Sequence, residues 1–249
     1  MSRFEIQSGP WSQLQYDAQL IRRKVFIEEQ NISEAEEWDD QDAVSLHFVM
    51  YEQNQPIATA RLLQNDSIGR VAVWLKMEAL QPAASFKQRS ISYACQKYFE
   101  QGAQRFVSSS GGNAGLAVAY TGRQLGVPVT VVVPETTAQR ARELIAQQGA
   151  EVIVHGASWG EANALAQSLL TQNDVFIHPF DDPLLWEGII PMIDEVIAEG
   201  VIPDAVVLSV GGGSLLSGVV AGLNKHGLGH VPVYAVETQG TASLNASAC

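Results

Sequence analysis

The sequence has few basic residues, and this shortage excludes two classes of partner. Its 249 residues include 15 Lys and Arg against 27 Asp and Glu, which gives a formal net charge of −12. A nucleic-acid surface needs clustered Lys and Arg, and so does a surface that docks on anionic lipid. Arg22, Arg23 and Lys24 stand close together, but Glu28 and Glu29 soon follow them. We therefore expect neither nucleic acid nor a membrane as a partner.

Cysteine and long apolar runs are scarce as well. Cys95 and Cys249 are far apart and match no metal-ligand spacing, which is typical of a protein from a reducing compartment. No segment is apolar over the ~20 residues that a membrane-spanning helix needs, and the N-terminus lacks the apolar core of a signal peptide. The sequence therefore predicts a cytoplasmic protein with one or two domains.

The pattern of residues 1–73 predicts a helix packed on an antiparallel sheet. Apolar residues recur at helical spacing in residues 11–30, among them Leu14, Ile21 and Phe26. Alternating apolar and polar residues between polar turns predict strands. These expected strands are residues 3–7, 45–51, 56–63 and 68–75. The acidic segment 34–40 is expected to be a solvated loop.

From residue 74 onward, short apolar runs alternate with helical patterns. The expected strands are residues 105–108, 129–133, 151–155, 175–178, 205–210 and 231–237. The expected helices are residues 90–99, 112–125, 137–148, 159–171, 183–199 and 214–225. Gly188 and Pro191 predict a break within the fifth of these helices. Because strands separated by helices of this length form crossover units, the predicted fold class is α/β with a parallel sheet.

Lys87 is the first residue with a candidate chemical role. Ser85 is a suitable N-cap for the helix that follows, which places Lys87 in the first helical turn beside the aromatic ring of Phe86. The helix dipole disfavours a positive charge there, so we expect a lowered pKa and an amine that can act as a nucleophile. The alternative is an ordinary surface lysine.

Two turns rich in small residues follow, each between an expected strand and a helix. Residues 108–115 read Ser-Ser-Ser-Gly-Gly-Asn-Ala-Gly, and residues 210–214 read Val-Gly-Gly-Gly-Ser. Free N–H groups at a helix start favour an anion, and glycine lets a ligand approach the backbone. The alternatives are plain packing turns or, for the second turn, a dinucleotide-binding fold with Glu237 on the ribose. That fingerprint would have a third glycine where Leu216 stands.

The lysine and the two turns together suggest one cofactor. Pyridoxal phosphate needs an amine to bind it covalently, a phosphate cup without a lysine, and a hydrogen-bond partner for its ring oxygen. Residues 74–248 resemble the pyridoxal-phosphate-dependent serine/threonine dehydratases of the tryptophan-synthase-like fold (fold type II). The segments that carry the resemblance are residues 75–78, 85–87, 109–115, 180–188, 208–213 and 235–240.

This resemblance implies a three-layer parallel-sheet fold with a small lobe at about 86–181 and a large lobe at about 74–85 and 182–249. It implies that Lys87 carries the cofactor as a Schiff base and moves the substrate's α-proton, with Phe86 against the pyridine ring. It also implies a phosphate site, a substrate-carboxylate site with Asn113 on the ring oxygen, and a monovalent cation at Glu237. The phosphate residues are Gly211, Gly212, Gly213 and Ser214, and the carboxylate residues are Ser110, Gly111, Gly112, Asn113 and Ala114.

The implied reaction is an α,β-elimination that converts L-serine or L-threonine into a 2-oxo acid and ammonia. A homodimer is compatible with this assignment. The family's Ser or Cys that faces the pyridine nitrogen has no counterpart up to residue 249, and Cys249 comes too early to be that residue. The resemblance therefore predicts weak turnover at most.

Residues 1–73 resemble the first half of a GNAT-type N-acetyltransferase, and this suggests a rival function. The resemblance is carried by residues 21–30, by Asp39 and Asp42, and by residues 55–63 and 68–73. The family's glycine-rich turn for the coenzyme A pyrophosphate is replaced by residues 74–78, Trp-Leu-Lys-Met-Glu. Three hypotheses result: a dehydratase behind a partial acetyltransferase region, an N-acetyltransferase, or an inactive chimeric or truncated product.

Overall fold

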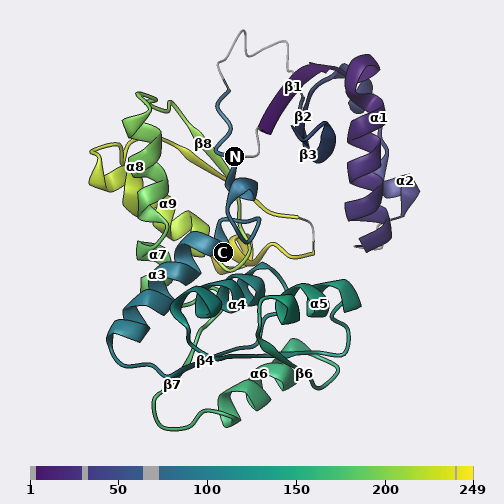
Figure 1. Cartoon of the computed structure of the whole chain (residues 1–249). Helices are drawn as coiled ribbons and strands as arrows, with labels where there is room; N and C mark the ends of the chain where they lie inside the picture. Colours follow the sequence, from purple (N-terminus) through teal and green to yellow (C-terminus); the bar gives the residue numbers. More distant parts are fainter. Residues whose placement is uncertain (1–3, 30–32, 64–72, 239, 249) are drawn as a thin grey trace. The chain divides into compact units, whose positions relative to one another are not determined.

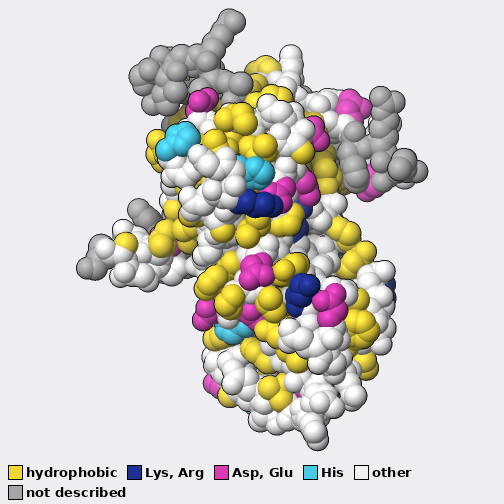
Figure 2. Space-filling model, turned by 90° about the vertical axis from the view of Figure 1, so that its left-hand side faces the viewer, with side chains coloured by type: hydrophobic (Ala, Val, Ile, Leu, Met, Phe, Trp, Pro, Cys, Tyr) yellow, Lys and Arg dark blue, Asp and Glu magenta, His cyan; other side chains and the backbone are white. Residues whose placement is uncertain are grey.

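The computed structural model describes residues 4–29, 33–63, 73–238 and 240–248, and the chain forms two compact units (Figure 1). These units are Met1–Leu75 and Lys76–Cys249. Among the described residues, no helix is both long enough and apolar enough to cross a bilayer. On the face drawn in Figure 2, Lys and Arg side chains are few and lie beside Asp or Glu.

The first unit is a helix on an antiparallel sheet, as the sequence predicts, and the described residues form three of the four expected strands. The sheet has the order β1-β2-β3, with bounds Phe4–Pro10, Ser45–Glu52 and Gln55–Leu63. Helix α1 (Trp11–Arg22) continues as a π-helical segment, Arg23–Glu29, and packs Leu14 and Ala18 against Val49 of β2. Of the expected strand 68–75, residues 68–72 lie outside the described residues, and residues 73–75 have no regular structure.

The acidic segment 34–40 is largely exposed where it is described, as predicted, but the prediction that all of it is loop is wrong. The short helix α2 (Glu34–Glu37) lies within it, and Arg22 donates hydrogen bonds to the carboxylate and the carbonyl of Glu37. Arg61 donates two hydrogen bonds to the carboxylate of Asp39. Arg22 is buried and needs carboxylate partners, so its bonds to Glu37 hold that residue against the end of α1, whereas Glu34, Asp39 and Asp40 stay exposed.

The second unit contains a four-stranded parallel sheet of the predicted kind. Its order is β6-β5-β4-β7, with bounds Glu151–Val154, Val129–Val133, Arg105–Ser108 and Asp174–Phe176. Four helices accompany this sheet: α3 (Lys87–Glu100), α4 (Asn113–Leu125), α5 (Gln139–Gln147) and α6 (Trp159–Ser168). The chain reverses its direction across the sheet between β6 and β7, and a right-handed crossover then requires α6 to lie on the other face. Figure 1 shows α4 and α5 on one side of the sheet and α6 on the other.

Each face of this sheet has its own apolar core. Phe106, Val131 and Val133 pack with α3, α4 and α5, whereas Val107 and Val132 pack against α6. Strand β5 is buried along its whole length, as expected for a central parallel strand with both faces covered. The carboxyl ends of these strands therefore meet at one edge, where loops can hold functional groups.

A smaller parallel sheet completes the second unit. Strands β8 (Val206–Ser209) and β9 (Val233–Val236) pair in parallel, and α8 (Ile190–Ala198) and α9 (Ser214–Lys225) pack beside them. The predicted break is confirmed, because α7 (Pro183–Glu187) ends before Gly188 and α8 begins afterwards. A Cβ on Gly188 would lie 2.9 Å from the backbone of α3, so only glycine permits this close approach. Helix α10 (Ser243–Ala248) was not predicted.

Candidate active site

Lys87 is the first residue of α3, but Ser85 does not cap this helix. The N-cap residue is Phe86, whose backbone angles are already helical (φ −56°, ψ −21°), and no side chain caps the N–H groups. The hydroxyl of Ser85 is buried without a hydrogen-bond partner. The prediction of a Ser85 N-cap is therefore wrong, because the chain enters the helix one residue later than the capping pattern requires.

The amine of Lys87 lies in a partly buried site with two oxygen partners. Its Nζ donates to the carbonyl oxygen of Pro179 at 2.5 Å and to Oγ of Ser214 at 3.2 Å. It also lies 5.2 Å from the centre of the Phe86 ring. Burial lowers the pKa of Lys87 from 10.5 to about 8. The direction agrees with the sequence prediction, but the cause is loss of solvent rather than the helix dipole.

A cavity of about 200 Å³ opens beside this amine. Its walls are Phe86, Lys87 and residues 209–216, which form the end of β8, the glycine loop and the start of α9. Here, "glycine loop" means Gly211, Gly212 and Gly213. The loop needs glycine for two separate reasons. Gly213 has φ +82°, and a Cβ on Gly212 would lie 2.3 Å from the ring of Phe180.

The glycine loop has the features of an anion site. Among the hydrogen bonds of the described residues, the N–H groups of Gly211, Gly212 and Gly213 have no protein acceptor. The loop leads directly into α9, whose first turn adds further free N–H groups and the positive end of the helix dipole. A cavity with a neutralisable amine on one wall and a phosphate cradle on the other fits pyridoxal phosphate.

The turn at residues 110–114 stands apart from this cavity. It follows β4 and opens α4, whose first residue, Asn113, is exposed. Oγ of Ser110 accepts a hydrogen bond from the N–H of Gly112, and a Cβ on Gly115 would collide with the carbonyl of Ser110. Among the described residues that wall the cavity, none comes from this turn. Its role in holding a substrate carboxylate or the ring oxygen stays a prediction.

The carboxylate of Glu237 is bound by backbone N–H groups of α10. Its carboxylate accepts hydrogen bonds from the N–H groups of Leu244 (2.7 Å) and Asn245 (2.9 Å), and these bonds lower its pKa. It therefore caps the start of α10. Among the described residues there is no group of three or more His, Cys, Asp or Glu that could hold a metal ion. The cation role of Glu237 stays a prediction.

Two site residues had no role assigned from the sequence: Pro179 through its carbonyl, and Phe180 through its ring. Both lie in the loop between β7 and α7. The signal available in the sequence was their place after the carboxyl end of a parallel strand, where sites of α/β proteins gather. Their contacts with Lys87 and Gly212 join segments that are far apart in the chain.

The chain resembles known proteins over most of this second unit. The family described as "Pyridoxal-phosphate dependent enzyme" matches residues 50–248. A serine dehydratase-like protein of Rattus norvegicus is 47% identical over 191 residues, covering 75% of this chain and 58% of that protein. The human L-serine dehydratase/L-threonine deaminase is 49% identical over 181 residues, covering 71% of this chain and 55% of that protein.

Solved structures agree with these matches. The L-serine ammonia-lyase of the fungus Rhizomucor miehei has a TM-score of 0.65 and 38% identity, with 69% of this chain and 56% of that chain covered. The chain thus spans little more than half the length of these relatives. The matched residues include Lys87, the residues that wall the cavity and the glycine loop. The chain therefore belongs to the pyridoxal-phosphate dependent enzyme family.

Proposed function

We propose that this chain binds pyridoxal phosphate through Lys87 and eliminates water from L-serine or L-threonine to give a 2-oxo acid and ammonia. The observation that carries the proposal is the amine of Lys87, whose pKa is about 8, facing the glycine loop across a cavity of about 200 Å³. The names of the relatives, which are serine dehydratases and threonine deaminases, support the substrate class.

The residues of the site divide the work between them. Near neutral pH part of the Lys87 population is uncharged, so its Nζ can act as a nucleophile and can accept a proton from the substrate's α-carbon. The N–H groups of the glycine loop and the hydroxyl of Ser214 bind phosphate oxygens. Phe86 covers one side of the amine and limits its solvation. Pyridoxal phosphate, when bound, supplies the electron sink that stabilises the carbanion.

The test compares the protein with a Lys87→Ala variant in the presence of pyridoxal phosphate. Lys97→Ala is the matched control, because Lys97 lies on the same helix but is exposed and pairs with Glu100. We expect the visible absorption band of a lysine-bound cofactor in the wild-type protein and in the control, and its absence in Lys87→Ala. The same spectrum in wild type and Lys87→Ala would refute the cofactor assignment.

Turnover is measured separately, as 2-oxo acid and ammonia formed from L-serine and from L-threonine. We expect equal amounts of both products, formed only when Lys87 is present. A Lys87-dependent band without any product would separate cofactor binding from catalysis and would support the alternative of an inactive product.

We also propose that residues 1–73 are related in fold to the first half of a GNAT-type acetyltransferase. The order strand, helix, strand, strand in one antiparallel sheet supports this. Residues 73–77, where a coenzyme A cradle would follow, have no regular structure and carry bulky side chains. We therefore expect no retention on immobilised coenzyme A, and clear retention that free coenzyme A reverses would favour acetyltransfer instead.

A further inference from the structure

His178 lies two residues after the end of β7 and immediately before Pro179, whose carbonyl accepts the hydrogen bond from Lys87. Its Nδ1 accepts two backbone hydrogen bonds, from the N–H of Asp181 at 2.8 Å and from the N–H of Phe180 at 3.3 Å. An imidazole nitrogen can accept these bonds only when it carries no proton. The fold therefore requires a neutral His178 whose hydrogen is on Nε2.

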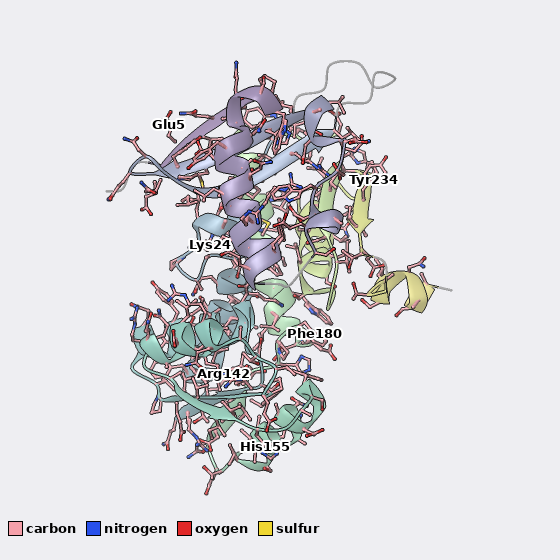
Figure 3. The ribbon with its side chains drawn as sticks, turned by 90° about the vertical axis from the view of Figure 1, so that its right-hand side faces the viewer. Glu5, Lys24, Arg142, His155, Phe180 and Tyr234 are labelled. Carbon is pink, nitrogen blue, oxygen red and sulfur yellow. The ribbon has the colours of Figure 1, made fainter. Side chains whose placement is uncertain are left out.

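The turn closed by these bonds touches both halves of the cavity. The carbonyl of Pro179 accepts a hydrogen bond from Nζ of Lys87, and the ring of Phe180 packs on Gly212. The same ring lies edge-on to the imidazole of His178, with centroids 4.7 Å apart and an angle of 84°. Figure 3 labels Phe180 where the four-stranded part of this unit meets the helices of the smaller sheet. The turn that the imidazole closes therefore carries both the hydrogen-bond partner of the amine and the ring that supports the glycine loop.

The groups around His178 act on its charge in opposite directions. Burial and the nearby Lys87 lower the pKa of His178, whereas Asp181 and Asp182 raise it, and burial is the largest cause. The carboxylate of Asp182 is already engaged by the hydroxyl of Tyr98 and by the N–H that starts α7. The rings of Phe176 and Phe180, which flank the imidazole, carry no charge.

We propose that His178 is a positioning residue for the cofactor site: its neutral ring shapes the turn at residues 179–181, and a proton on Nδ1 opens that turn and weakens cofactor binding. The inference rests on the proposed function, because it assumes that the cavity takes pyridoxal phosphate. The proton comes from solvent, displaces the two N–H donors from Nδ1, and removes one of the restraints on Pro179 and Phe180, whose remaining restraints are the bonds from Lys87 and Trp186 to their carbonyls.

Two variants distinguish the role of His178 as a hydrogen-bond acceptor from the effect of its protonation. In His178→Asn the side-chain oxygen can accept the N–H groups two and three residues ahead, as asparagine does in turns, and it does not titrate. In His178→Leu no acceptor remains and two N–H groups lose their partner. The phosphate group and the free cofactor titrate equally in experiments with all three proteins, so only differences between the proteins test the role of His178.

The first measurement is the dissociation constant of pyridoxal phosphate. At about pH 8 we expect wild type and His178→Asn to agree within about threefold and His178→Leu to bind roughly tenfold more weakly, which corresponds to the net free energy of about one ordinary hydrogen bond. At about pH 5.5, one unit below the ordinary histidine pKa of about 6.5, we expect wild type to bind more weakly than His178→Asn, by up to about tenfold. The proposal is overturned if wild type and His178→Asn keep the same ratio at both pH values, whether or not His178→Leu folds.

The second measurement needs no cofactor. Amide hydrogen exchange of Asp181 in the apo protein is followed by NMR, as protection relative to a short peptide at each pH. We expect protection at about pH 8 in wild type and in His178→Asn, and its loss at about pH 5.5 in wild type alone. If none of the proteins binds pyridoxal phosphate but this exchange pattern appears, the proposed function is refuted, whereas the role of His178 in shaping the turn is supported. Equal protection at both pH values in wild type refutes the role of His178.

Discussion

The lowered pKa of Lys87 predicts how fast this residue takes up pyridoxal phosphate at each pH. The reactive form is the neutral amine, and burial brings its pKa from 10.5 to about 8. At about pH 7.5 a pKa of 8 leaves about a quarter of the amine neutral, whereas a pKa of 10.5 leaves about a thousandth. Lys87 should therefore have roughly 200-fold more reactive amine than an unperturbed lysine at that pH.

The assay is a stopped-flow record of the visible band after apo protein is mixed with pyridoxal phosphate, from about pH 6 to about pH 10. Nα-acetyl-lysine, whose ε-amine is free, serves as the control amine. Dividing the rate of the protein by the rate of this control removes the effect of the cofactor's own titrations. We expect the protein's rate to rise about tenfold per pH unit and to level off near pH 8. The control should continue to rise through pH 10. A protein rate that keeps rising with the control would refute a buried amine at this position.

Two further predictions concern groups that hold the site in place. Gly212→Ala should weaken cofactor binding and cost about 1–3 kcal/mol of unfolding free energy, because the new methyl would overlap Phe180. The control is Gly211→Ala, whose methyl meets no atom within 4 Å and should change the unfolding free energy little. Arg89→Met should cost about 1 kcal/mol at neutral pH in urea titrations, because Arg89, together with Lys76, bonds Glu195 and lowers the pKa of that half-exposed carboxyl to about 2. A folded pKa below the unfolded value of 4.5 means that this stabilisation is present above pH 4.5 and is lost as pH falls toward 2, so the variant and wild type should converge in acid.

The features that the sequence could predict are those that depend on neighbours in the chain. Buried β-branched runs such as Val129–Val133 identify central parallel strands, and glycine followed by a helical pattern identifies the loop at residues 211–213. The position of Lys87 in the first turn of its helix also follows from local pattern. The failed Ser85 cap shows the limit of such reasoning, since a shift of one residue removes the hydrogen bond.

The features that the sequence could not predict depend on contacts between distant segments. Lys87 and Pro179 are separated by 92 residues in the chain, and the fold brings them together so that Nζ of Lys87 donates to the carbonyl of Pro179. Helix α10 is short and is capped by Glu237, a residue that the sequence suggested for a cation. The burial of Lys87, which sets its pKa, is likewise a property of the packed unit. Sequence patterns therefore identified residues such as Lys87, but the partners and the burial of these residues are known only from the tertiary structure.

The site is assembled from two sheets, and this arrangement links its chemistry to the stability of the second unit. Lys87 belongs to a helix packed on the four-stranded sheet, whereas the glycine loop belongs to the two-stranded sheet. The hydrogen bond from Lys87 to Ser214 and the contact of Phe180 with Gly212 connect the two. A ligand held by both sides binds only when they are correctly apposed, so it stabilises that apposition by mass action. A hundredfold excess over the dissociation constant adds about 2.7 kcal/mol to the unfolding free energy of this unit. Pyridoxal phosphate should therefore raise the unfolding midpoint of the wild-type protein, and it should raise that of Lys87→Ala less at the same concentration, because only the phosphate site remains.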